Sequence, residues 1–90
     1  MAVVHVIQAS VRGKSEVAFD SHAVKRMAER HITEAQVLAT LEKPDITGLR
    51  ADPGRLRFCK HYGGHHSIDV VFEEEPTRIV VISTVRVVRK

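Results

Sequence analysis

Residues 21–32 read Ser21-His22-Ala23-Val24-Lys25-Arg26-Met27-Ala28-Glu29-Arg30-His31-Ile32. Alanine, valine and methionine recur along this stretch at helical spacing, and Asp20 or Ser21 can cap the free N–H groups of its first turn. We therefore predict a helix that ends near His31. Its residues His22, Arg26 and Arg30 are four positions apart, and each such step turns only about 40° around a helix axis. The spacing predicts that one imidazole and two guanidinium groups form a stripe along the helix.

A second helix follows directly. Thr33 and Gln36 have the spacing of a capping box, in which each side chain satisfies the backbone N–H group of the other. Val37, Leu38 and Leu41 then form an apolar face. Proline disfavours helical geometry in the residue before it, so the helix should end around residues 42–43, ahead of Pro44. Residues 44–54 contain two prolines and two glycines and predict a loop.

The rest of the chain predicts β structure. We expect strands at about residues 3–8, 55–62, 67–73 and 78–87, with a turn or loose connection at 9–14. A three-residue loop at 63–65 would place Phe58 opposite Val70 and Cys59 opposite Asp69. A four-residue loop at 74–77 would place Phe72 opposite Ile79 and Val70 opposite Val81. Both choices bring apolar side chains to one face of the sheet.

The two faces of this predicted sheet differ in character. The buried face would carry Leu56, Phe58, Val70, Phe72, Ile79 and Val81, which the two helices can cover. The opposite face would carry Arg57, Cys59, His61, Asp69, Thr84 and Arg86, together with Val71, Val80 and Ile82. This second face is too apolar to be fully solvated, so we predict partial cover by the N-terminal strand, the C-terminal tail or another subunit. The expected fold is a single α+β domain, residues 1–90, with two N-terminal helices packed on a three- to four-stranded antiparallel sheet.

Composition limits the classes of function. The 90 residues carry 14 Lys and Arg against 11 Asp and Glu, a formal net charge of +3 that is compatible with an anionic partner. No apolar run approaches the roughly 20 residues that a membrane-spanning helix needs. The single cysteine, Cys59, excludes an internal disulfide and favours a reducing compartment. We expect a protein of a bacterial-type cytoplasm that has no membrane partner.

The helical stripe suits RNA as a substrate. Cleavage of RNA without a metal needs a group to move protons and cations to stabilise the charge on the phosphate. His22 could be the acid or base, and Arg26 and Arg30 could hold the phosphate. The alternative is a solvated helix face on which Glu29 pairs with Lys25 or Arg26.

Three further residues are candidates for substrate binding. Arg57, His61 and Arg86 are expected on the exposed sheet face, where they could contact bases or phosphates. The alternative is that they are ordinary solvent-facing residues of antiparallel strands. His61, His65 and His66 could suggest a metal site, but the predicted register pairs His61 with Ser67, so we predict no metal and no cofactor.

The pattern H-x-x-x-R-x-x-x-R-x-I, formed here by His22, Arg26, Arg30 and Ile32, resembles the signature of a small bacterial family of uncharacterised domains. In that family Thr or Ser follows, as Thr33 does here, and a second helix carries a valine, here Val37. The strand at residues 79–85 also resembles the family's end, so the resemblance covers about residues 18–86.

Such domains resemble RelE-type and BrnT-type toxins, in which helices pack on an antiparallel sheet. The resemblance implies a RelE-like fold and an RNA-binding protein or metal-independent ribonuclease of a toxin–antitoxin system, with an antitoxin protein as a partner. The alternative is a non-catalytic small oligomer that binds nucleic acid or protein through its second sheet face. Replacing His22 by Ala should abolish cleavage in the first case and change little in the second.

Overall fold

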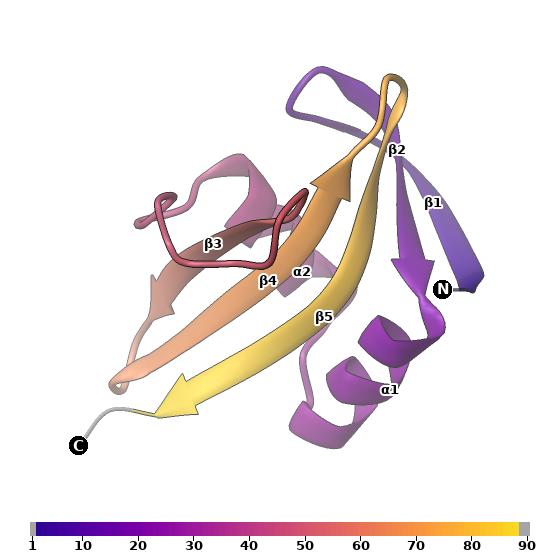
Figure 1. The fold of residues 1–90 in the computed structure, drawn as a ribbon. Coiled ribbons are helices and arrows are strands. Elements are labelled where there is room, and N and C mark those ends of the chain that lie inside the picture. The colour runs from indigo at the N-terminus through magenta and orange to yellow at the C-terminus, as the bar shows by residue number, and fades with distance from the viewer. Residues whose placement is uncertain (1, 89–90) are drawn as a thin grey trace.

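The computed structural model describes residues 2–88 and contains two helices and one five-stranded sheet (Figure 1). The elements follow in the order β1 (Val3–Val11), β2 (Lys14–Asp20), α1 (Ser21–Arg30), α2 (Glu34–Glu42), β3 (Leu56–Tyr62), β4 (His66–Glu74) and β5 (Arg78–Val88). In space the strands run β1-β2-β5-β4-β3. The strand that precedes the helices therefore lies beside the last strand of the chain, at the centre of the sheet.

The predicted fold, two N-terminal helices on a three- to four-stranded antiparallel sheet of RelE-like form, is wrong. Two strands precede the helices, and β2 pairs with β5 in parallel, from Glu16 opposite Arg78 to Phe19 opposite Val81. We had assigned no strand to residues 14–20. Val17, Ala18 and Phe19 are all fully buried, because β2 is an inner strand with cover on both faces. A three-residue apolar run of this kind lacks the alternation that marks a half-exposed strand.

The two helices begin at side-chain caps. Asp20 Oδ2 accepts a hydrogen bond from the backbone N–H of His22 at 3.0 Å and so caps α1. The predicted capping box of α2 is confirmed, because Thr33 and Gln36 each accept from the other's backbone N–H group. His31 ends α1 in the left-handed conformation, at φ 54°, and the chain turns there into α2.

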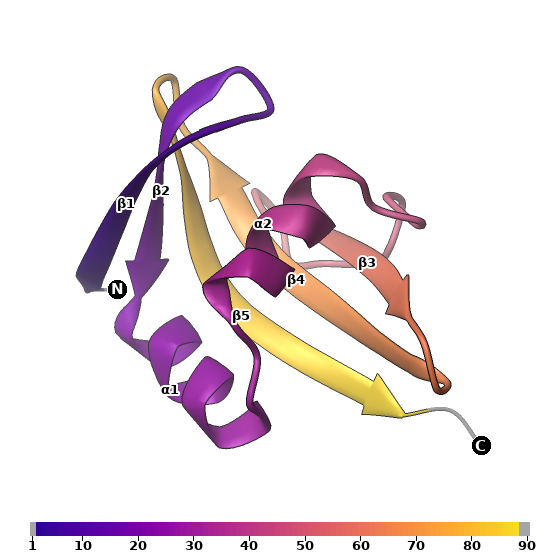
Figure 2. The ribbon, with the colours of Figure 1, turned by 180° about the vertical axis from the view of Figure 1, so that it is seen from behind.

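Both helices contribute to one core. Seen from behind, α2 lies across β3 and β4, whereas α1 continues from β2 and lies beside β5 (Figure 2). We call the side of the sheet that α2 covers the helix face and the other side the open face. The core on the helix face is apolar throughout and consists of Val11, Val17, Phe19, Ala23, Met27, Ile32, Val37, Leu41, Phe58, Ile68, Val70, Phe72, Ile79 and Val81.

The register of the first predicted hairpin is confirmed. Phe58 lies opposite Val70, Cys59 opposite Asp69 and His61 opposite Ser67. The register of the second hairpin is wrong, because the connecting turn is shorter than four residues. The N–H of Glu75 donates to the carbonyl of Arg78 at 2.9 Å and closes the chain around Pro76 and Thr77.

The shorter turn moves every pair in the second hairpin. Phe72 lies opposite Val81, two residues beyond the predicted Ile79. The register then shifts again, because Val71 pairs with Ser83 and Ile82 is left as an extra residue. This bulge reverses the faces of the residues that follow it. Thr84 and Arg86, which we had placed on the exposed sheet face, therefore lie on the side of the helices.

Part of the open face is covered, as we had expected, but by a segment that we had not named. The connection between α2 and β3 passes over the front of the sheet in Figure 1. At its start, Ile46 and Cys59 form an isolated antiparallel bridge. The part of the chain that the structure describes has no helix that is both long and apolar enough to span a membrane.

Candidate functional site

The predicted cationic stripe lies along α1. His22 is exposed, while Arg26 and Arg30 are half-buried. Ala23 and Met27 are buried against the sheet, so successive steps of four residues carry the stripe from solvent towards β5. The three predicted catalytic residues therefore share one flank of the helix but have different surroundings.

The C-terminal end of α1 is joined to β5 by two arginines. Arg30 Nη1 donates to the carbonyl oxygen of Thr84 at 3.1 Å. In return, Arg86 Nε donates to the carbonyl oxygen of Arg30 at 3.0 Å, and Arg86 Nη2 donates to that of His31 at 3.0 Å. Carbonyl groups in the last turn of a helix have no partner within the helix, so Arg86 supplies one. These contacts hold both guanidinium groups in place, and each keeps further N–H donors for other partners.

Positive charge is concentrated on this part of the molecule. Lys25, Arg26, Arg30 and Arg86 provide four positive charges, and Glu29 is the acidic residue among them. Together these five residues have a net charge of +3, which is the formal net charge of the whole chain. We call this surface, with His22, the α1 basic surface. The remaining charged residues of the chain cancel one another.

Outside the α1 basic surface, acidic residues pair with most of the arginines, so that part of the molecule has no excess positive charge. Among residues 2–88, five ion pairs outside α1 involve four arginines; they join Arg12 to Glu74, Arg55 to both Asp52 and Glu73, Arg57 to Asp69 and Arg78 to Glu75. On α1, Arg26 and Glu29 form an ion pair at 3.3 Å, and their side chains are 35% and 43% exposed. Exposed pairs of this type are weak and can exchange for a phosphate. The alternative interpretation of the stripe, in which Glu29 pairs with Lys25 or Arg26, is thus realised for Arg26.

The predicted substrate-binding residues fall into two groups. Arg57 and His61 lie on the open face, at alternate positions of β3. Arg86 lies on the other side of the sheet, beside Arg30, because of the bulge in β5. The structure therefore associates Arg86 with the α1 basic surface and separates it from Arg57 and His61.

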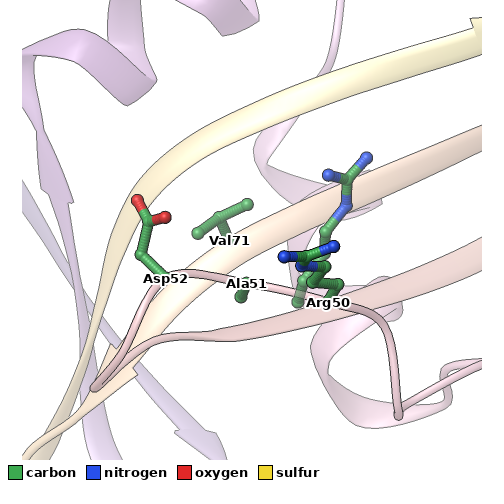
Figure 3. Close-up of a pocket in the computed structure, with 5 residues that line it drawn as sticks. Arg50, Ala51, Asp52 and Val71 are labelled. Carbon is green, nitrogen blue, oxygen red and sulfur yellow. The ribbon is translucent and has the colours of Figure 1, made fainter.

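The open face contains a pocket that the sequence did not reveal. Its volume is about 310 Å³, and it lies between the loop that leads into β3 and the sheet (Figure 3). It is lined by Arg50, Ala51, Asp52, Arg57 and Val71. Arg57 and Val71 are cross-strand neighbours, so their shared face was predictable. The position of the loop above them was not, because residues 44–55 show no periodic pattern.

Charges in this pocket largely balance. Arg57 donates to the buried carboxylate of Asp69 through both Nε, at 2.8 Å, and Nη2, at 2.6 Å. Asp52 brings a second carboxylate to the rim, where Arg50 is the remaining cation. A site with two arginines and two nearby carboxylates attracts a phosphate less than the α1 basic surface does.

The other candidates are placed as follows. His61 is exposed at β3, and His66 is half-buried at the start of β4. Within residues 2–88, no three His, Cys, Asp or Glu side chains come close enough together to hold a metal ion. Cys59 is buried, opposite Asp69.

The fold and the surface define a small α+β domain in which a basic helix lies beside β5, the middle strand of a mixed five-stranded sheet. A family model matches residues 19–86, and the chain belongs to that family, which is described as a domain of unknown function (DUF4258). The match begins near the end of β2 and includes both helices and the three strands that follow. No curated protein matches the chain, and no solved structure matches it.

Proposed function

We propose that the protein binds RNA through the α1 basic surface. The observation that carries this proposal is the excess of positive charge on α1 and the end of β5, where four cations accompany a single carboxylate. Phosphate contacts dominate the affinity of proteins for nucleic acids, and arginine binds phosphate oxygens in a forked geometry. RNA is proposed as the polyanion because domains with this helix signature resemble RelE-type and BrnT-type toxins, and that resemblance implies a role on RNA.

The surface combines fixed and adaptable cations. Arg30 and Arg86 are held by backbone carbonyl groups, so their positions are set before any ligand arrives. Lys25 and Arg26 lie further out on the helix, where Lys25 is exposed and Arg26 forms a weak pair with Glu29. Fixed donors define where a phosphate can bind, and exposed cations can follow the next phosphate along the strand.

Binding should be measured with a single-stranded RNA of mixed sequence in EDTA, by fluorescence anisotropy at several salt concentrations. The test variant is Lys25→Gln with Arg26→Gln, which removes two charges without touching the contacts of Arg30 or Arg86. The matched control is Lys14→Gln with Lys43→Gln, which removes two charges from the start of β2 and the C-cap of α2.

We expect the test variant to bind more weakly than wild type and the slope of log affinity against log salt to fall by about 1.4, since each lost phosphate contact on a single strand is worth about 0.7. The control should keep the wild-type slope to within about 0.3, well below the change for a single contact. Absence of RNA binding by the wild type, or equal weakening in both variants, would contradict the proposal.

A second candidate function is cleavage of the bound RNA, favoured by the position of His22 on the same flank. His22 is exposed. Its backbone N–H donates to the carboxylate of Asp20, and this hydrogen bond does not involve the imidazole ring. An imidazole beside bound phosphates could exchange a proton with the RNA 2′-oxygen. The variant His22→Ala should keep the wild-type affinity and lose the cleavage seen on a denaturing gel in EDTA. If the wild type left the RNA intact, cleavage would be contradicted and RNA binding would be the remaining function.

A further inference from the structure

The two edges of the sheet differ in how they are protected. At the β3 edge, the N–H of Cys59 donates to the carbonyl of Ile46 at 2.9 Å, and the N–H of Ile46 donates back at 3.1 Å. The carboxylate of Asp45 accepts from the N–H of His61 at 2.7 Å. The chain leading into β3 thus occupies the hydrogen-bonding positions along that edge. No segment of residues 2–88 does so for β1, which ends the strand order on the other side (Figure 1).

Strand β1 also lacks the side chains that usually prevent pairing at an edge. Its nine residues, VVHVIQASV, include no Lys, Arg, Asp, Glu or Pro. Natural sheets commonly protect their edges with charges, prolines or very short strands. Three valines of β1 are instead exposed to solvent, Val3 at 36%, Val4 at 58% and Val6 at 41%.

The middle of β1 is regular enough to serve as a template. Its pairing with β2 is irregular between Val3 and His5 and again between Gln8 and Val11. Between these points, residues 5–8 pair continuously with residues 16–19. The outward N–H and C=O groups of this segment therefore have the ordinary spacing of a strand and can accept a neighbour.

We propose that two copies of this chain associate by antiparallel pairing of β1 with β1. A two-fold axis near residues 5–8 would join the two sheets into one of ten strands. Each copy would then provide hydrogen-bond partners for the outward N–H and C=O groups of the other copy's β1. Because β1 contains no Lys, Arg, Asp or Glu, and its His5 already contacts Glu34 of the same chain, self-pairing places none of these charged side chains opposite one another. The same axis keeps the exposed Val6 side chains of both copies on one face, where they become neighbours.

The association should be weak and insensitive to salt. Nine residues from each copy are fewer than the roughly 20–30 per partner of a standard interface, so we expect a weak dimer that dissociates on dilution. Hydrogen bonds and valines, rather than ion pairs, supply the contact, so raising the salt concentration should not dissociate it. RNA binding through α1 would show the opposite response to salt.

The test is analytical ultracentrifugation of the full chain between about 5 and 500 µM, at low and high salt, with no RNA present. Wild type should shift from monomer to dimer over this range at both salt concentrations. The variant Val6→Lys should remain monomeric, because a charge at the axis would face its own copy. The matched control is Val24→Lys, since Val24 is an exposed valine of α1, at 38%, with no place in the pairing.

Circular dichroism would establish that both variants keep the wild-type spectrum, as expected for exposed positions. A wild type that is monomeric at every concentration would overturn the proposal. A dimer that survives Val6→Lys and is lost in Val24→Lys would also overturn it and would place the contact on α1. The pairing would be supported directly if Val6→Lys abolished the dimer and the β1 amide protons of the wild type exchanged more slowly at high protein concentration.

Discussion

At the scale of single residues, Arg30 serves the structure as well as the candidate site. Its guanidinium group donates to the carbonyl of Thr84, a residue with no exposed surface, on the part of β5 that extends beyond β2. Arg26, one turn earlier, pairs with the exposed carboxylate of Glu29. Two arginines of the same stripe therefore differ in what their removal would do.

We expect Arg30→Ala to reduce the free energy of unfolding by about 1–2 kcal/mol, because it leaves a buried carbonyl without its charged donor. Arg26→Ala should change it by less than about 0.5 kcal/mol, as is usual for an exposed ion pair. Urea unfolding followed by circular dichroism measures both. Equal losses in the two variants would show that the contact with Thr84 contributes nothing, and then loss of RNA binding in Arg30→Ala could be interpreted directly.

The pair of Arg57 and Asp69 offers a second test at this scale. The Asp69 side chain is 7% exposed and receives two hydrogen bonds from the guanidinium group of Arg57. We expect Arg57→Ala to cost about 2–4 kcal/mol, because it leaves a buried carboxylate unpaired. Arg55→Ala is the control, since its partner Glu73 is 29% exposed and can be solvated. Similar unfolding midpoints for the two variants would mean that water reaches Asp69.

At the scale of elements, local signals were sufficient for the helices and for one hairpin. The capping pair of Thr33 and Gln36 specifies the start of α2, and the alternation of Phe58 and Val70 about a three-residue loop specifies the register of β3 and β4. These features depend only on neighbours in sequence, or on one face that must be buried. For this reason they could be predicted.

Apart from the short turn at Pro76 and Thr77, the features that were not predicted depend on contacts between distant segments. Strand β2 is recognisable only when its burial between β1 and β5 is known, and the extra residue Ile82 leaves no mark on the alternation of β5. That bulge decides whether Arg86 joins Arg57 or Arg30. Of the candidate site, the α1 stripe therefore follows from sequence, while the contribution of β5 and the pocket beside Arg50 require the structure.

The cap of α2 can be tested as an element. We expect Thr33→Ala to reduce the free energy of unfolding by about 1 kcal/mol, because it leaves the backbone N–H of Gln36 without an acceptor. Thr47→Ala, at an exposed position in the loop, is the control and should stay within about 0.5 kcal/mol of wild type. Thermal and urea unfolding would both report the difference. If the two variants were equally stable, water would be replacing the cap.

At the scale of the whole molecule, the sheet consists of two parts that are each local in sequence. One part is the hairpin of β1 and β2, and the other is the run of β3, β4 and β5. A single parallel pairing, between β2 and β5, joins these parts through residues that are 62 positions apart, as the contact of Ser15 with Thr77 illustrates. The sheet is therefore continuous in space, although its strands belong to two groups that are separate along the chain.

This division has a consequence for the order of folding. Pairing distant segments requires the closure of a long loop, whose entropic cost slows its formation, whereas neighbouring strands meet early. We expect β3, β4 and β5 to be largely formed in the transition state and β2 to join afterwards. Stopped-flow measurements would then show Val70→Ala slowing folding and Val17→Ala mainly accelerating unfolding, while the reverse pattern would place the parallel pair in the nucleus. Until β2 joins, the central edge of β5 is open to other chains, so the yield of refolding should fall as protein concentration rises.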